Sequence, residues 1–60
     1  MKNDVKWRQM DDEDYMNNRD NMVLVRTDIT IRLSWARYID DHSHRLRDHN
    51  EQALEWAYIE

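Results

Sequence analysis

The chain contains no glycine, and this absence constrains its possible folds more than any other single feature. Glycine adopts positive backbone φ angles without steric cost, so tight hairpin turns and helix C-caps normally rely on it. Proline is also absent, which removes the other residue that usually marks turns. In such a chain, turns that need a positive φ must use asparagine or aspartate.

The length of 60 residues sets a second limit, because so short a chain forms one domain at most, spanning residues 1–60. Small domains often gain stability from disulfides, metals or a partner chain, and the lack of cysteine excludes disulfides and thiolate zinc sites. We therefore expect oligomerisation. The longest apolar run, Met22 to Val25, is too short to cross a bilayer and no apolar segment follows Met1, so we expect a cytoplasmic protein.

Alternating apolar and polar residues predict two strands. In "DVKWRQM", Val5 and Trp7 alternate with basic residues, which indicates a short N-terminal strand, with a frayed terminus as the alternative. In "MVLVRTDITIRL", residues 22–33, the apolar face contains Val23, Val25, Thr27, Ile29, Ile31 and Leu33. We expect one long strand here rather than a hairpin folded near Thr27-Asp28, because Thr-Asp lacks the positive-φ residues that a two-residue turn prefers.

A helical pattern follows the second strand. Ser34 can cap a helix N-terminus through its hydroxyl, and residues placed at about 100° per step from Trp35 give a continuous apolar stripe. The stripe contains Tyr38, Ile39, His42, Leu46, His49, Ala53, Trp56 and Ala57. One helix from Trp35 to about Ile59 would be on the order of 37 Å long, which is longer than so small a monomer is wide.

These patterns together predict an α+β fold. It comprises a short N-terminal strand, an acidic loop, a long amphipathic strand and a long C-terminal amphipathic helix that packs across the sheet. The residues expected to face one another in the core are Val5, Trp7, Val23, Val25, Ile29, Ile31 and Leu33 on the strands, and Trp35, Ile39, Leu46, Ala53 and Trp56 on the helix. Because the helix is too long to be covered by one sheet, we expect a homodimer with an interface formed by Tyr38, His42, Leu46, His49, Ala53 and Trp56.

The charge of the chain is concentrated in one segment. Between Asp11 and Asp20 lie five acidic residues and one basic residue, a local charge of −4 that equals the net charge of the chain. A solvated loop without a role is one interpretation, because charge runs usually stay in water. The other is that these carboxylates, with Tyr15 and Met16 among them, occupy a basic groove that normally holds nucleic-acid phosphates. The expected partner-binding residues are Asp11, Asp12, Glu13, Asp14, Tyr15, Met16 and Asp20.

No pattern in the chain indicates an enzyme or a cofactor. Asp41, His44 and Asp48 fall on one face of the predicted helix and could approach a metal ion, but zinc sites prefer several nitrogen or sulfur ligands. The carboxylates of residues 11–14 would need a desolvated cleft for acid–base catalysis. We therefore predict no catalytic residue, no metal and no cofactor. The sequence favours a small acidic protein-binding module, an inhibitor or nucleic-acid mimic of phage or mobile-element type, that engages a basic surface of a nucleic-acid-processing partner.

The segment "ITIRLS", residues 29–34, with the predicted helix after it resembles the ribbon-helix-helix repressors. Paired strands from two chains of that family enter the DNA major groove. The resemblance implies that Thr30 and Arg32 read bases and that Arg26 adds a further contact, so a DNA-binding dimer is the alternative function. The negative net charge, and Asp28 on the reading face, favour the protein-binding interpretation.

Overall fold

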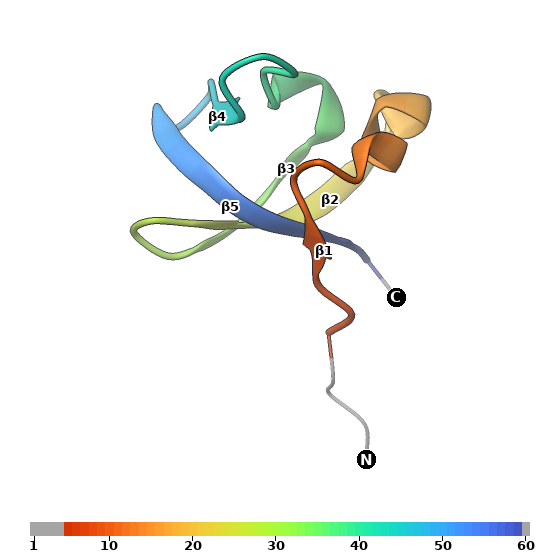
Figure 1. Ribbon diagram of the computed structural model, residues 1–60, viewed down its shortest axis with the longest axis horizontal. Coiled ribbons are helices and arrows are strands. Elements are labelled where there is room, and N and C mark those ends of the chain that lie inside the picture. The colour runs from red at the N-terminus through yellow and green to blue at the C-terminus, as the bar shows by residue number, and fades with distance from the viewer. Residues whose placement is uncertain (1–4, 60) are drawn as a thin grey trace.

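The computed structural model describes residues 5–59, which form a curved antiparallel sheet (Figure 1). The strands are β1 (Arg8–Gln9), β2 (Met22–Thr27), β3 (Ile31–Trp35), β4 (Arg45–Leu46) and β5 (Glu51–Tyr58). Their order is β1-β5-β2-β3, and β4 pairs with the beginning of β5. The connections include the 3-10 helices η1 (Glu13–Asn18) and η2 (Ala36–Tyr38). Residues 5–59 contain no α-helix, and so none that is long and apolar enough to cross a bilayer.

The predicted α+β architecture is therefore wrong, chiefly in the C-terminal half of the chain. Instead of one helix from Trp35 to Ile59, this segment ends β3, forms η2 and β4, and returns as β5. Turn-forming side chains interrupt it: the Asp40 carboxylate accepts a hydrogen bond from the backbone N–H of His42 (2.8 Å), and Asn50 adopts a φ of 54°. Aspartate and asparagine side chains offer the backbone such alternatives to helical hydrogen bonds.

The N-terminal strand that the alternation predicts is present but short. It consists of β1, in which Arg8 lies opposite Trp56 and Gln9 lies opposite Glu55. Asp4, the first residue of the predicted segment, lies outside the described residues.

The predicted single strand over residues 22–33 is wrong, because the segment is a hairpin of β2 and β3. Thr27 organises the turn: its Oγ1 accepts hydrogen bonds from the backbone N–H groups of Ile29 (3.1 Å) and Thr30 (3.0 Å). The backbone N–H of Thr27 donates to the Thr30 carbonyl (2.7 Å). The side chain thus satisfies the turn, and none of residues 28–30 has a positive φ.

The hairpin also decides which side chains face the core. Opposite residues in an antiparallel pair share a face, and Val23 lies opposite Ser34 whereas Leu24 lies opposite Leu33. Val23 and Ser34 are buried, while Leu33 is 54% exposed on the other face. The residues that are exposed although we predicted them in the core are Val5, Ile29, Ile31, Leu33 and Trp35.

The core lies on the inner side of the curved sheet and is centred on Trp56. The Trp56 side chain is fully buried and meets the ring of Tyr15 edge-on, with ring centroids 5.5 Å apart. The core residues that the sequence predicted and the structure confirms are Val23, Val25, Ile39, Leu46, Ala53 and Trp56. Met10, Tyr15 and Ala36, which were not predicted, complete the same cluster.

The six residues expected at a dimer interface do not form one surface, because the helix that would align them is absent. Leu46, Ala53 and Trp56 are buried within the chain itself. The His42 side chain is 93% exposed in the loop before β4, and His49 lies in the loop between β4 and β5. Tyr38 ends η2 and packs against the core.

Candidate functional site

The acidic segment folds as an anchored turn, which we call the acidic turn and define as residues 11–20. Asp12 caps η1 with a carboxylate oxygen that accepts from the N–H of Asp14 (3.3 Å). The Asp12 carbonyl accepts a hydrogen bond from Nε1 of the buried Trp56 (2.8 Å). Tyr15 inserts into the core and is 1% exposed. The acidic turn is therefore held to the core by contacts that span most of the chain.

A network of side chains neutralises part of the acidic turn. The guanidinium of Arg8 lies 3.1 Å from the carboxylate of Asp12 and 3.8 Å from that of Asp14. Asp14 also accepts hydrogen bonds from the Tyr58 hydroxyl and from the Asn17 amide. The bond from Tyr58, and then that from Asn17, hold the pKa of Asp14 below its usual value. The same bond raises the pKa of Tyr58.

Arg8 contributes more than charge to this network. Its guanidinium carbon lies 5.3 Å from the ring centroid of Trp56 and 4.9 Å from that of Tyr58. A cation over an aromatic face is attracted by the ring quadrupole. Arg8 therefore joins the β1 edge, the β5 aromatic residues and the acidic turn into one structural unit.

Three carboxylates of the acidic turn remain directed at solvent. Asp11 and Glu13 are exposed. Asp20 has a side chain that is 95% exposed and lies 3.4 Å from the guanidinium of Arg37. An ion pair this exposed contributes little stability, so these three carboxylates are the ones most open to a partner. The side chains of Asp12 and Asp14 are 42% and 45% exposed but are engaged by Arg8.

The other predicted partner-binding residues have structural contacts. Asp12 and Asp14 hold the turn as described, and Met16 is partly buried against the core. Tyr15 is buried, burial raises the pKa of its hydroxyl, and that hydroxyl has no hydrogen-bond partner among residues 5–59. The structural role of Asp12 could have been predicted from the sequence, because aspartate is a common N-cap residue at the start of a helix.

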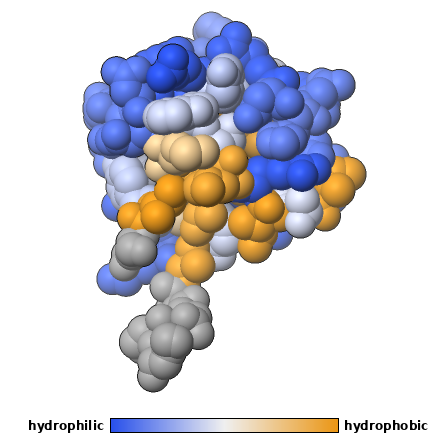
Figure 2. All heavy atoms as spheres, turned by 180° about the vertical axis from the view of Figure 1, so that it is seen from behind, coloured by the Kyte–Doolittle hydropathy of each residue, from blue (hydrophilic) through white to orange (hydrophobic). Residues whose placement is uncertain are grey.

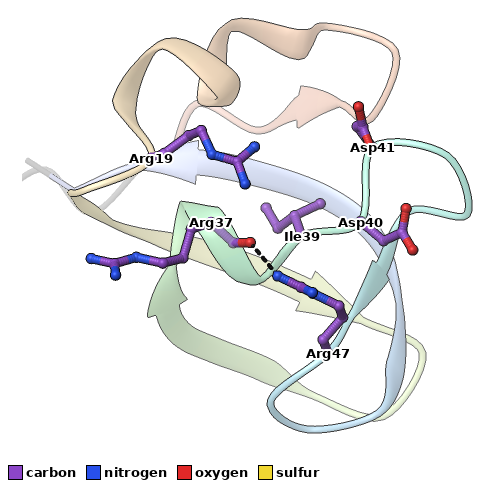
Figure 3. Close-up of a pocket in the computed structure, with 6 residues that line it drawn as sticks. All are labelled: Arg19, Arg37, Ile39, Asp40, Asp41 and Arg47. Atoms are coloured by element: carbon purple, nitrogen blue, oxygen red, sulfur yellow. Dashed lines mark hydrogen bonds between the residues drawn. The ribbon is translucent and has the colours of Figure 1, made fainter.

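A shallow polar hollow adjoins the acidic turn and was not predicted (Figure 3). Its volume is about 170 Å³, and it is lined by Arg19, Arg37, Ile39, Asp40, Asp41 and Arg47. Arg47 donates to the carbonyl of Arg37 (2.9 Å), and the backbone N–H of His42 and then that of Ser43 lower the pKa of Asp40. The hollow has charges of both signs and no nucleophilic side chain.

The residues considered as metal ligands do not converge. Within residues 5–59, no group of three or more histidine, aspartate or glutamate side chains could hold a metal ion. Asp48 instead accepts a hydrogen bond from the Ser34 hydroxyl (2.7 Å). Ser34 is buried in β3, so its prediction as a helix cap is wrong.

The residues expected to read DNA do not share a surface. Arg26 and Arg32 lie on opposite faces of the hairpin, because Arg26 pairs with Glu55 on the outer face while Arg32 reaches Glu51 on the core side. The charged atoms of these pairs are 2.7 Å and 2.6 Å apart, so both guanidinium groups are neutralised. Thr30 lies in the hairpin loop. Since η2 follows β3 where a helix was expected, the resemblance to ribbon-helix-helix repressors does not extend to the fold.

A second candidate surface is the outer face of the sheet, on the side opposite the core. Leu24 lies on this face between Leu33 of β3 and Ala57 of β5, and Met22 lies opposite Trp35. Leu33 is 54% exposed and Trp35 is 38% exposed. Figure 2 shows apolar side chains gathered in a band on one side of the molecule. Exposed apolar patches that are contiguous often mark interaction sites.

Comparison of the chain with protein families, curated proteins and solved structures found no match. The surfaces of the chain itself are therefore the basis for inferring its function.

Proposed function

We propose that this chain is a non-enzymatic protein-binding module whose acidic turn engages a basic surface of a partner, as a nucleic-acid mimic does. One observation carries the proposal. Asp12 fastens the acidic turn to Trp56, whereas Asp11, Glu13 and Asp20 are left exposed. The same short segment thus contains both an anchor and free negative charges.

The anchoring matters because ordering a flexible segment on binding costs free energy. Trp56 and Tyr58 hold the turn through Asp12 and Asp14 before any partner arrives. The exposed carboxylates are then presented in a fixed arrangement. Charges of this kind mainly accelerate encounter with an oppositely charged surface.

A groove that binds nucleic-acid phosphates is the expected partner surface, because it carries closely spaced lysine and arginine side chains. Trp35 provides an apolar neighbour for the exposed charges: the guanidinium of Arg37 lies 5.2 Å from the Trp35 ring centroid and 3.4 Å from Asp20. Mixed contacts of charge and aromatic surface are common at protein interfaces.

The test compares wild-type protein with two variants of equal net charge. Asp11→Asn combined with Glu13→Gln removes two negative charges from the acidic turn. Asp28→Lys changes the net charge by the same amount in the exposed loop of the β2–β3 hairpin. Each protein is immobilised and used to capture partners from lysate, and the association rate of each captured partner is then measured with purified components at low and high salt.

We expect the Asp11/Glu13 variant to lose association rate and salt sensitivity, on the order of tenfold at low salt. The Asp28→Lys variant should bind like wild type, and duplex DNA should compete with the wild-type protein for the partner. Equal losses in both variants would mean that only net charge matters. Partners that bind all three proteins equally would contradict a role for the acidic turn.

A further inference from the structure

The strand β3 forms an open edge of the sheet. It lies at one end of the strand order, with β2 as its sheet neighbour, whereas the opposite end is the two-residue β1. A five-residue edge strand presents a row of backbone groups that can pair with another strand. The side chains exposed along β3 are those of Ile31, Leu33 and Trp35.

The hydrogen-bond phase of the hairpin shows which backbone groups of β3 are free. Bonds from Thr27 N–H to the Thr30 carbonyl (2.7 Å) and from Ala36 N–H to the Asn21 carbonyl (3.0 Å) mark the bonded pairs. Bonded and non-bonded pairs alternate along an antiparallel ladder. The pairs Val25–Arg32 and Val23–Ser34 are therefore bonded, and Ile31, Leu33 and Trp35 direct their N–H and C=O groups away from β2.

The open groups and the exposed apolar side chains thus belong to the same residues. Within residues 5–59, no hydrogen bond outside the β2–β3 ladder uses the backbone of Ile31 or Leu33. The N–H of Trp35 is likewise open, whereas its carbonyl, at the N-cap of η2, accepts the first hydrogen bond of that helix. Natural edge strands are usually protected by lysine, proline, a bulge or an unpaired inward charge. β3 has no lysine or proline, and the irregular register lies between β2 and β5 instead.

We propose that β3 pairs antiparallel with β3 of a second copy of this chain, about a two-fold axis at Leu33. In this register Leu33 lies opposite Leu33 of the copy, and Ile31 lies opposite Trp35. Leu33 and its copy can exchange two hydrogen bonds, and the Trp35 N–H of each chain can donate to the Ile31 carbonyl of the other. The pairing therefore forms about four backbone hydrogen bonds. Aromatic and β-branched residues opposite each other stabilise strand pairs, which favours the contact of Ile31 with Trp35.

The charges of β3 are compatible with self-pairing. The only charged residue of the strand is Arg32, which in this register lies opposite Ser34 of the copy. An inward charge on an edge strand normally opposes pairing. Here Arg32 donates two hydrogen bonds to Glu51 (3.0 and 2.6 Å), so its charge is already compensated. No like charges meet across the axis.

The size of the contact predicts a weak dimer. A stable interface buries about 800 Å² per partner, roughly a fifth of the 4175 Å² that this chain exposes. Pairing of one short strand covers less than this. We therefore expect a dissociation constant on the order of tens of micromolar.

The test is sedimentation equilibrium from low micromolar to several hundred micromolar protein. Wild type should shift from monomer to dimer within this range. Leu33→Pro separates edge pairing from packing of the apolar faces: proline is tolerated where an edge N–H points to solvent, and it leaves the outer face apolar. We expect it to remain monomeric with unchanged near-ultraviolet circular dichroism. Association of this variant equal to that of wild type overturns the proposal.

A charge swap tests the two-fold register and does not depend on the proline variant. Leu33→Lys and Leu33→Glu should each be monomeric, because like charges would lie directly opposite each other, and an equimolar mixture should form heterodimers. The control is Leu54→Lys, on an exposed leucine of β5, which should dimerise like wild type. A wild type that stays monomeric throughout, or a mixture that does not associate, overturns the proposal.

Discussion

Replacing Leu46 with alanine tests whether the C-terminal half of the chain folds as strands around a core. Leu46 is fully buried, lies in the two-residue strand β4 opposite Glu51, and forms an isolated bridge to Ile39. If this residue lay on a long helix at a dimer interface, its truncation would weaken association. In the observed fold it instead removes packing from within one chain.

The expected cost follows from this burial. Truncation of a buried leucine to alanine costs about 2 to 5 kcal/mol, depending on how far the site collapses. The side chain neighbours short elements and exposed loops, so we expect partial collapse and a loss of about 3 kcal/mol. A chain of this length has a total stability of about 3 to 9 kcal/mol. With a urea slope of about 1 kcal/mol per molar, the midpoint should fall by about 3 M.

The assay is urea unfolding followed by tryptophan fluorescence at low micromolar protein, with Leu54→Ala as the control. Leu54 is 41% exposed on β5, so its truncation should cost less than about 1 kcal/mol. Two results would refute the reasoning. One is a loss below about 1 kcal/mol for Leu46→Ala. The other is a midpoint that rises with protein concentration within the low micromolar range, below the dissociation constant expected for β3 pairing, as for an obligate dimer.

Three further predictions concern the acidic turn, an ion pair and a strained turn. Asp14→Asn should lower the thermal midpoint because its carboxylate is hydrogen-bonded and ion-paired, whereas Glu13→Gln should not, and equal midpoints in scanning fluorimetry would contradict this. Hydrogen bonds from Arg32 hold the pKa of Glu51 at about 2 instead of 4.5, so its stabilising effect should be complete above about pH 5 and lost as the pH falls toward 2; an acid titration of the unfolding midpoint should show a limb that Glu51→Gln flattens. His44 has a φ of 59°, and His44→Gly should stabilise the fold by up to about 1 kcal/mol in urea unfolding; an unchanged or lower midpoint would show that the turn is not strained.

Period-two alternation predicted β2 and its buried face correctly, because β2 has a polar or half-buried outer face. Val23 and Val25 are buried, and Leu24 between them is only half-buried. β5 lacks this pattern because its register with β2 shifts between Arg26 and Thr27, where Glu55 and Ala53 are the partners. Such a bulge adds one residue to a strand, so Ala53 and Trp56 are both buried although they are three residues apart. A spacing of three also fits one face of a helix, which is why the sequence pattern predicted a helical stripe.

The candidate site could be located from the sequence but not resolved into its parts. The run of Asp11, Asp12, Glu13 and Asp14 is uniform as a charge pattern. In the structure, two of these residues are bound by side chains 44 positions away in the chain: Trp56 donates to the Asp12 carbonyl, and Tyr58 donates to the Asp14 carboxylate. Asp11 and Glu13 remain exposed. Contacts of this range leave no local signal, so exposure of individual carboxylates could not be predicted.

Turn formation without glycine accounts for part of the acidic run, through Asp12. Turns within residues 5–59 repeatedly use the same device, in which a side-chain oxygen accepts the backbone N–H two residues later: Asp12 from Asp14, Thr27 from Ile29, Asp40 from His42, and Ser43 from Arg45. This geometry closes a turn without a positive φ, and only His44 and Asn50 among residues 5–59 have one. Part of the negative charge at residues 11–14 is therefore a consequence of turn formation. The carboxylates of Asp11 and Glu13 do not close a turn in this way. They, and not Asp12, are therefore the residues to neutralise when binding is tested.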